Sequence, residues 1–187
     1  QATGLVSKSV HLDLRSEVVP NSGRGVDAEG YCSLLAAVLS ETRRTIKPGG
    51  RMVLTFHNTD GRAWWALARA LGKAGFSVNA LAVAHAENES DHAKRGRRAF
   101  SRDLILECRP NPSGDAPPVV VTEARNAESR ELLAAGRAVA GLAARVVADG
   151  SVENYQSFGA RYREHLQAAK SLYIRFGADP SQGGERG

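Results

Sequence analysis

The feature that most constrains the fold is a strand–helix–strand pattern in the first half of the chain. Residues 51–57 read RMVLTFH, a short, β-branched and mostly apolar run that is typical of a central strand in a parallel sheet. A helical pattern through Trp64 and Leu67 follows and stops at Gly75, and residues 76–86 form a second strand-like run. Because strands joined by a helix usually share a direction, the sequence predicts an α/β layer fold.

The neighbouring segments extend this sheet. Apolar residues from Tyr31 to Ile46 have helical spacing, and Asp27 is a plausible N-cap for that helix. A third strand is expected at residues 101–109, after a polar and basic loop that contains no helical pattern. A strand reached without a helix is able to run antiparallel. We therefore expect a mostly parallel sheet with an antiparallel last strand.

The second half of the chain has a different composition. Four prolines within residues 110–119 indicate a linker, and two helical patterns follow, at about 123–148 and 152–176. The sequence thus predicts an α-helical hairpin as a tail behind the sheet. The expected division is 1–110 for the sheet domain, 111–121 for the linker, 122–178 for the helical tail and 179–187 for a disordered end.

The first half resembles a known family. The turn Lys47-Pro48-Gly49-Gly50 between a helix and an apolar strand is similar to the region around strand five of class I methyltransferases. The next segment resembles bacterial adenine-specific DNA methylases, a group that includes proteins with an N-terminal domain of unknown function. The matching residues are Thr55-Phe56-His57, Trp64, Ala74-Gly75-Phe76, the basic loop Lys94 to Arg98 and the strand Asp103 to Pro110.

The resemblance covers about residues 10–110 and implies part of a Rossmann-like methyltransferase sheet. It implies a DNA (adenine-N6) methyltransferase, which transfers a methyl group from S-adenosylmethionine to adenine in DNA. The family's glycine-rich cofactor loop and its Asp/Asn-Pro-Pro-Tyr/Phe motif are both absent from the sequence. We therefore expect no catalytic or cofactor-binding residue here, and no activity from this chain alone. Because the chain begins at Gln1, we expect a truncation, with the missing N-terminal half or a complementary subunit supplying both motifs.

Three polar residues follow the first predicted strand: His57, Asn58 and Thr59. In open parallel sheets, ligands bind beyond the carboxyl ends of the strands. These residues are therefore candidates for one wall of the target-base pocket. The alternative is that His57 caps the strand and Asn58 shapes the turn. The adjacent Trp64 and Trp65 point about 100° apart on a helix, so we expect one to pack on the sheet and the other to lie nearer the surface.

Five positive charges fall within nine residues of the polar loop and the start of the third strand: Lys94, Arg95, Arg97, Arg98 and Arg102. The whole chain has a formal net charge of +5. Basic side chains of this kind bind DNA phosphates without reading sequence, so DNA is the expected partner. The alternative is a solvated surface loop.

The remaining features exclude other classes. Cys32 and Cys108 lie in apolar surroundings and belong to no zinc motif, so we expect buried thiols and no metal site. No apolar run approaches the roughly 20 residues of a membrane span, and a cytoplasmic location is expected. Two other functions stay open: a non-catalytic DNA-binding or subunit-docking module, and a class I methyltransferase acting on RNA or a small molecule.

Overall fold

A computed structural model describes residues 27–85, 100–111, 118–151, 153–167, 171 and 173–177. This part of the chain is an α/β structure with a four-stranded mixed sheet and four helices. The expected strand near residues 10–15 and the expected disordered end at 179–187 lie outside the described residues. The elements in order are α1 (Ala28–Thr45), β1 (Met52–Phe56), α2 (Gly61–Lys73), β2 (Phe76–His85), β3 (Arg102–Pro110), β4 (Val120–Val121), α3 (Ala127–Asp149) and α4 (Tyr155–Leu166).

The sheet is mostly antiparallel, so the expectation of a mostly parallel sheet is wrong. Its strand order is β1-β3-β2-β4, and β3 pairs antiparallel with both β1 and β2. The strands β1 and β2 share a direction, as a helical connection favours, but β3 lies between them. β2 and β4 form the one parallel pair in the described sheet. The antiparallel direction of β3 agrees with its helix-free connection, whereas its central position depends on tertiary packing.

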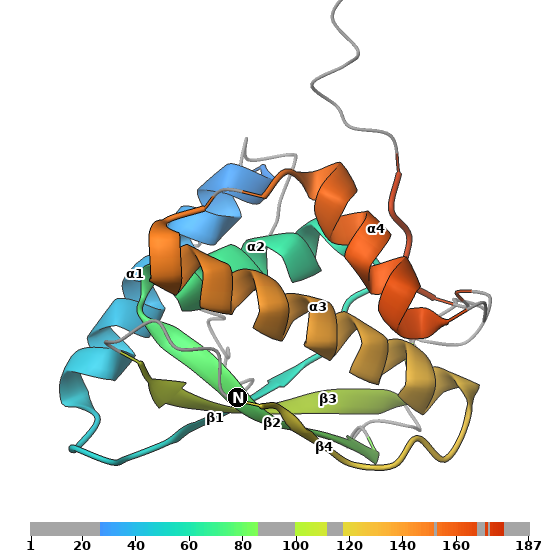
Figure 1. Ribbon diagram of the computed structural model, residues 1–187, viewed down its shortest axis with the longest axis horizontal. Helices are drawn as coiled ribbons and strands as arrows, with labels where there is room; N and C mark the ends of the chain where they lie inside the picture. The colour runs from blue at the N-terminus through green and yellow to red at the C-terminus, as the bar shows by residue number, and fades with distance from the viewer. Residues whose placement is uncertain are drawn as a thin grey trace, which may run out of the picture.

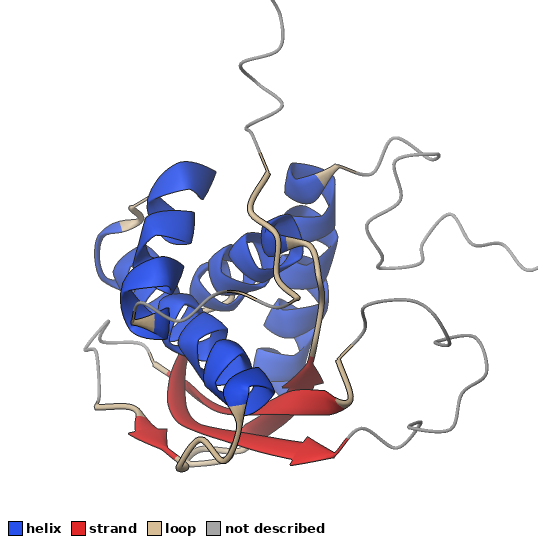
Figure 2. Cartoon of the chain, turned by 90° about the vertical axis from the view of Figure 1, so that its right-hand side faces the viewer, coloured by secondary structure: helices blue, strands red, loops and turns tan. Residues whose placement is uncertain are grey.

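All four described helices lie on one side of the sheet (Figures 1 and 2). This arrangement explains why burial alternates along β1. Met52, Leu54 and Phe56 are half-buried, whereas Val53 and Thr55 are exposed. The side chain of Val53 is 66% exposed. Among the described residues no helix covers the second face, which we call the open sheet face.

The helix α2 lies between the helices α1 and α3 and also contacts the sheet. Its N-cap Asp60 accepts a hydrogen bond from the Arg62 amide at 2.9 Å. Trp64 is fully buried and packs edge-on against Phe56, with ring centroids 4.8 Å apart. Trp65 is half-buried. The expected division between the two tryptophans is thus confirmed: the first packs in the core and the second lies nearer the surface.

The second half of the chain shares one hydrophobic core with the sheet. The range 111–121, which we expected to be a linker, ends in the strand β4 beside β2. The helix α3 packs directly on the sheet at Gly136, where an added Cβ would lie 2.9 Å from Leu104 Cδ2 and 3.0 Å from Leu81. A glycine at this crossing lets the helix approach the strands closely.

The helix α4 is shorter than the sequence pattern indicated. It ends at Leu166, where Gln167 adopts a positive φ of 54° and stops the helical hydrogen bonding. Residues 173–177 are not helical, and Arg175 forms an isolated parallel bridge with Asp60. The sequence predicted one long helix because aromatic residues up to Tyr173 recur at helical spacing. Phe176 instead packs against α4 from outside the helix, with its ring centroid 4.9 Å from that of Tyr162.

Candidate functional site

One end of the sheet gathers the polar residues that the sequence singled out. The strands β1 and β2 end here, at Phe56 and His85, and β3 begins here, with Arg102 paired to His85. The register that pairs Phe56 with Leu104 places His57 beside Asp103. The basic residues Lys94, Arg95, Arg97 and Arg98 lie outside the described residues, but both ends of their loop are fixed at this edge.

His57 is oriented by two neighbours. Its Nδ1 is hydrogen-bonded to Asp103 Oδ1, and its ring centroid lies 6.3 Å from that of the buried Phe100. A carboxylate at Nδ1 holds the proton on that nitrogen in the neutral ring, which leaves Nε2 as a hydrogen-bond acceptor. The His57 side chain is 38% exposed. A ligand at this end of the sheet is therefore able to reach an oriented imidazole.

Asn58 and Thr59 stabilise the backbone after β1, in agreement with the alternative interpretation that Asn58 shapes the turn. The Asn58 side-chain oxygen accepts from the Asp60 amide at 2.8 Å, and its carbonyl accepts from the Trp64 indole at 2.8 Å. The Thr59 carbonyl accepts from the Arg175 amide at 2.9 Å. These bonds form an Asx-type turn that leads into α2. His57 is thus the residue of the three whose side chain has the chemistry of a ligand contact.

Glu128, in the first turn of α3, fixes the start of β3. Its Oε1 accepts from the backbone amides of Ser101 and Arg102, at 2.6 and 3.0 Å, and its Oε2 accepts from the Ser101 hydroxyl at 2.9 Å. One end of the basic loop is therefore tied to α3.

Arg102 lies within β3 and is partly buried. Its position two residues before Leu104 places it on the helix-covered side of the sheet, because side chains alternate along a strand. Its Nε is buried and has no hydrogen-bond partner among the described residues. Arg102 is thus a partly buried strand residue, and the four basic residues with which the sequence grouped it lie outside the described residues.

Sequence reasoning missed Asp103, Phe100 and Glu128 at this site. Asp103 carries a weak signal, because it is a charged residue near the start of an otherwise apolar strand. Its pairing with His57 depends on strand register, and the contacts of Glu128 depend on the docking of α3. No local sequence pattern encodes either one.

Two cavities of the described structure have linings rich in arginine and lysine. One has a volume of about 550 Å³ and is lined by Arg137, Arg145, Arg161 and His165 among others, and the second, of about 450 Å³, by Arg43, Arg69 and Lys73 among others. No acidic residue of the described chain lines either cavity. S-adenosylmethionine carries a cationic sulfonium and a ribose diol, and carboxylates suit both groups.

The cysteines have the environment that the sequence predicted. Cys32 and Cys108 are both buried and free. Burial raises the pKa of both thiols, to about 12 for Cys108. In the described ranges, no three His, Cys, Asp or Glu side chains gather in a way that would hold a metal ion.

The fold and the site define an α/β protein with a mixed sheet, helices on one face and a histidine–aspartate pair at the strand ends. Comparison with known proteins gave no match, whether to a protein-family model, a curated protein or a solved structure. None of the helices that the structure describes has the length and apolar character needed to cross a membrane.

Proposed function

We propose that this chain forms one wall of the target-base site in a DNA adenine methyltransferase that uses S-adenosylmethionine. The observation that carries the proposal is the His57–Asp103 pair at the carboxyl end of β1. The resemblance of residues 10–110 to adenine-specific DNA methylases supplies the reaction class. The cofactor supplies the methyl group when bound, and its site comes from a partner segment or subunit.

The chemistry of His57 suits an exocyclic amino group. Adenine N6 carries two hydrogens, and a base flipped out of the duplex is read by hydrogen bonds to its edge. With Nδ1 bonded to Asp103, Nε2 of the neutral ring accepts one of these hydrogens. Such a bond orients the amino group, and positioning accounts for much of catalysis in reactions of this kind.

The basic loop supports DNA as the substrate. Its ends, His85 and Phe100, lie at the same end of the sheet as His57. Phosphate contacts from Lys94, Arg95, Arg97 and Arg98 would place the duplex beside the proposed base site, because such contacts fix register and orientation. The basic segment therefore begins and ends at the same end of the sheet as the His57 imidazole.

The test is methyl transfer by the complete protein. The complete product of the gene that encodes this chain is produced, and tritium is followed from S-adenosylmethionine into adenine N6 of DNA. His57→Ala is expected to lower kcat/KM by roughly 10- to 100-fold, because the amino group loses its oriented acceptor. Asp103→Ala is also expected to lower kcat/KM, because the His57 imidazole is then no longer held in one tautomer.

Thr59→Ala is the matched control, because Thr59 takes part through its backbone carbonyl. Its kcat/KM is expected to stay within about twofold of the parent. Absence of transfer to adenine by the complete protein overturns the proposal. Equal kcat/KM in His57→Ala and the parent removes His57 from the site.

A second function, a non-catalytic DNA-binding module, is favoured by one observation. The chain lacks both the glycine-rich loop and the Asp/Asn-Pro-Pro-aromatic motif. DNA binding that persists without methyl transfer in the same experiment would support this module.

A further inference from the structure

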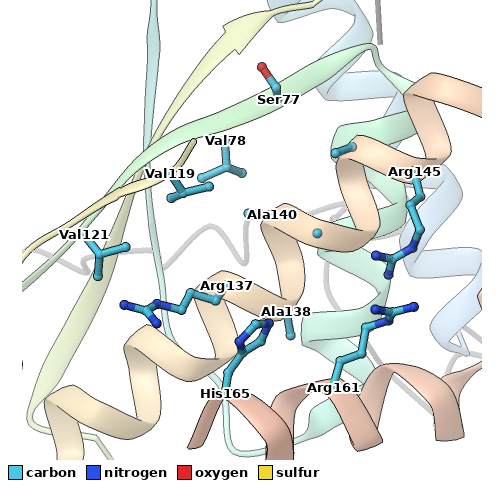
Figure 3. A pocket seen from close by; sticks show the side chains of 12 residues that line it. Ser77, Val78, Val119, Val121, Arg137, Ala138, Ala140, Arg145, Arg161 and His165 are labelled. Atoms are coloured by element: carbon cyan, nitrogen blue, oxygen red, sulfur yellow. The ribbon is translucent and has the colours of Figure 1, made fainter. Parts of the chain in front are cut away.

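A cavity of about 550 Å³ lies between the β2–β4 edge of the sheet and the helices α3 and α4 (Figure 3). Its sheet wall contains Ser77 and Val78, at the amino end of β2, together with Val119 and Val121. The His57 site lies at the carboxyl end of β1, so the two sites are separate. We call this cavity the α3–α4 pocket.

The α3–α4 pocket carries an excess of positive charge. Arg145 and Arg161 both bond the carboxylate of Glu153, Arg161 through Nε at 2.8 Å. One carboxylate thus faces two guanidinium groups. Arg137 adds a third cation, and no described residue forms an ion pair or hydrogen bond with it.

The pKa of His165 reflects the same excess of positive charge. Burial lowers the pKa of His165, as do the guanidinium groups of Arg137 and Arg161, and the carboxylate of Glu164 opposes them. Figure 3 shows His165 close to Arg137, whose side chain points away from Arg161, while Arg145 and Arg161 face one another. An anion bound beside Arg137 would offset part of this positive charge.

The walls of the pocket suit an apolar body next to the anion. Valine side chains form the sheet side, and Ala138, Gly141 and Ala144 form the α3 side. A Cβ added to Gly141 would meet Arg145 Nη1 at 3.5 Å and no closer atom. The small residues of α3 therefore leave space beside the guanidinium groups.

We propose that the α3–α4 pocket binds a small molecule that carries a phosphate group on an apolar body. The guanidinium group of Arg137, which points toward Val121 (Figure 3), holds the phosphate, for which arginine is well suited by its planar set of donors. The valine wall of β2 and β4 holds the apolar body. This inference does not rest on the proposed methyltransferase function.

Calorimetry with the full chain tests the proposal. Phenyl phosphate (the monophosphate probe), inorganic phosphate and uncharged phenol are the probes, at constant ionic strength. The monophosphate is expected to bind more tightly than either of the others, because only it has both parts. Arg137→Gln is expected to weaken its binding by roughly 10- to 100-fold, the loss of one charge-assisted hydrogen-bond set.

Gly141→Leu fills the pocket without changing its charge, and it is expected to abolish binding of the monophosphate. Arg163→Gln is the matched control, since Arg163 is an exposed cation of α4 that does not line the pocket. Its binding constant should equal that of the parent. Absence of binding up to about 10 mM monophosphate, or equal weakening in Arg163→Gln and Arg137→Gln, overturns the proposal.

The titration of His165 gives a second readout. A bound phosphate is expected to raise the lowered pKa of His165, so binding strengthens as pH falls through that range. The imidazole proton resonances are followed with and without monophosphate, and His165→Gln assigns the signal. A shift confined to other histidines contradicts the placement.

A last probe separates two sources of the phosphate. An oligonucleotide without terminal phosphates carries only diesters. Failure of this oligonucleotide to displace the monophosphate supports a small-molecule ligand. Its tighter, Arg137-dependent binding overturns that assignment and identifies a nucleic-acid backbone as the ligand.

Discussion

Glu131 is a buried carboxylate of α3 that organises the end of the described chain. It is 1% exposed and accepts hydrogen bonds from the Tyr173 and Ile174 amides and from the Ser171 hydroxyl, the last two at 2.7 and 2.6 Å. The Tyr162 hydroxyl donates to it at 3.1 Å. In the sequence Glu131 is one charged residue of an alanine- and leucine-rich helix, and its partners lie 31 to 43 positions away.

Removal of this carboxylate is expected to destabilise the protein. Glu131→Ala should lower the free energy of unfolding by roughly 2–4 kcal/mol, because several buried donors lose their acceptor. Glu131→Gln keeps one acceptor oxygen and should lose less. Urea denaturation measures both. The exposed Glu164→Ala is the control and should stay within about 0.5 kcal/mol of the parent, and an equally small effect of Glu131→Ala would contradict the assigned role.

At the scale of elements, the crossing of α2 and α3 depends on Gly72. A Cβ added there would approach the side chain of Val146, with Cγ1 at 2.7 Å, and the Ala143 carbonyl at 2.8 Å. The backbones of the two helices therefore meet closely. The sequence pattern identified both helices, but it contained no sign that they touch at this glycine.

Gly72→Ala is expected to lower the free energy of unfolding by about 1–3 kcal/mol, because overpacking at a rigid crossing outweighs the gain in helix propensity. Gly141→Ala is the comparison, because a Cβ there has open space apart from Arg145 Nη1 at 3.5 Å. It should raise stability by up to about 1 kcal/mol. Thermal unfolding followed by circular dichroism distinguishes the two, and a stabilising Gly72→Ala would contradict this crossing.

At the scale of the whole molecule, the open sheet face is the main unpartnered surface of the described structure. Val53 and Val120 lie on it, with exposures of 66% and 70%, and the registers place them on the same face as Ala82 and Ile105. The outer edge of β1 has no strand partner in the described sheet. Apolar residues on an uncovered sheet favour association between chains.

Lysine on this face is expected to reduce self-association. The double variant Val53→Lys and Val120→Lys should scatter less light at high protein concentration, because it interrupts the apolar surface with charge. Its free energy of unfolding should change by less than about 0.5 kcal/mol. Val38→Lys is the control, an exposed valine of α1 with 49% exposure. Equal effects of both variants on scattering would show that added charge alone is responsible.

The sequence by itself determined most of the described helices and strands, though neither β4 nor the end of α4, because apolar periodicity and caps such as Asp27 and Asp60 act over a few neighbouring residues. It also placed His57 at a strand end and one tryptophan in the core. Tertiary structure alone decided that β3 enters between β1 and β2, that Asp103 meets His57, and that α3 shares the core of the sheet. These outcomes depend on register and on the packing of distant side chains, which no local pattern contains.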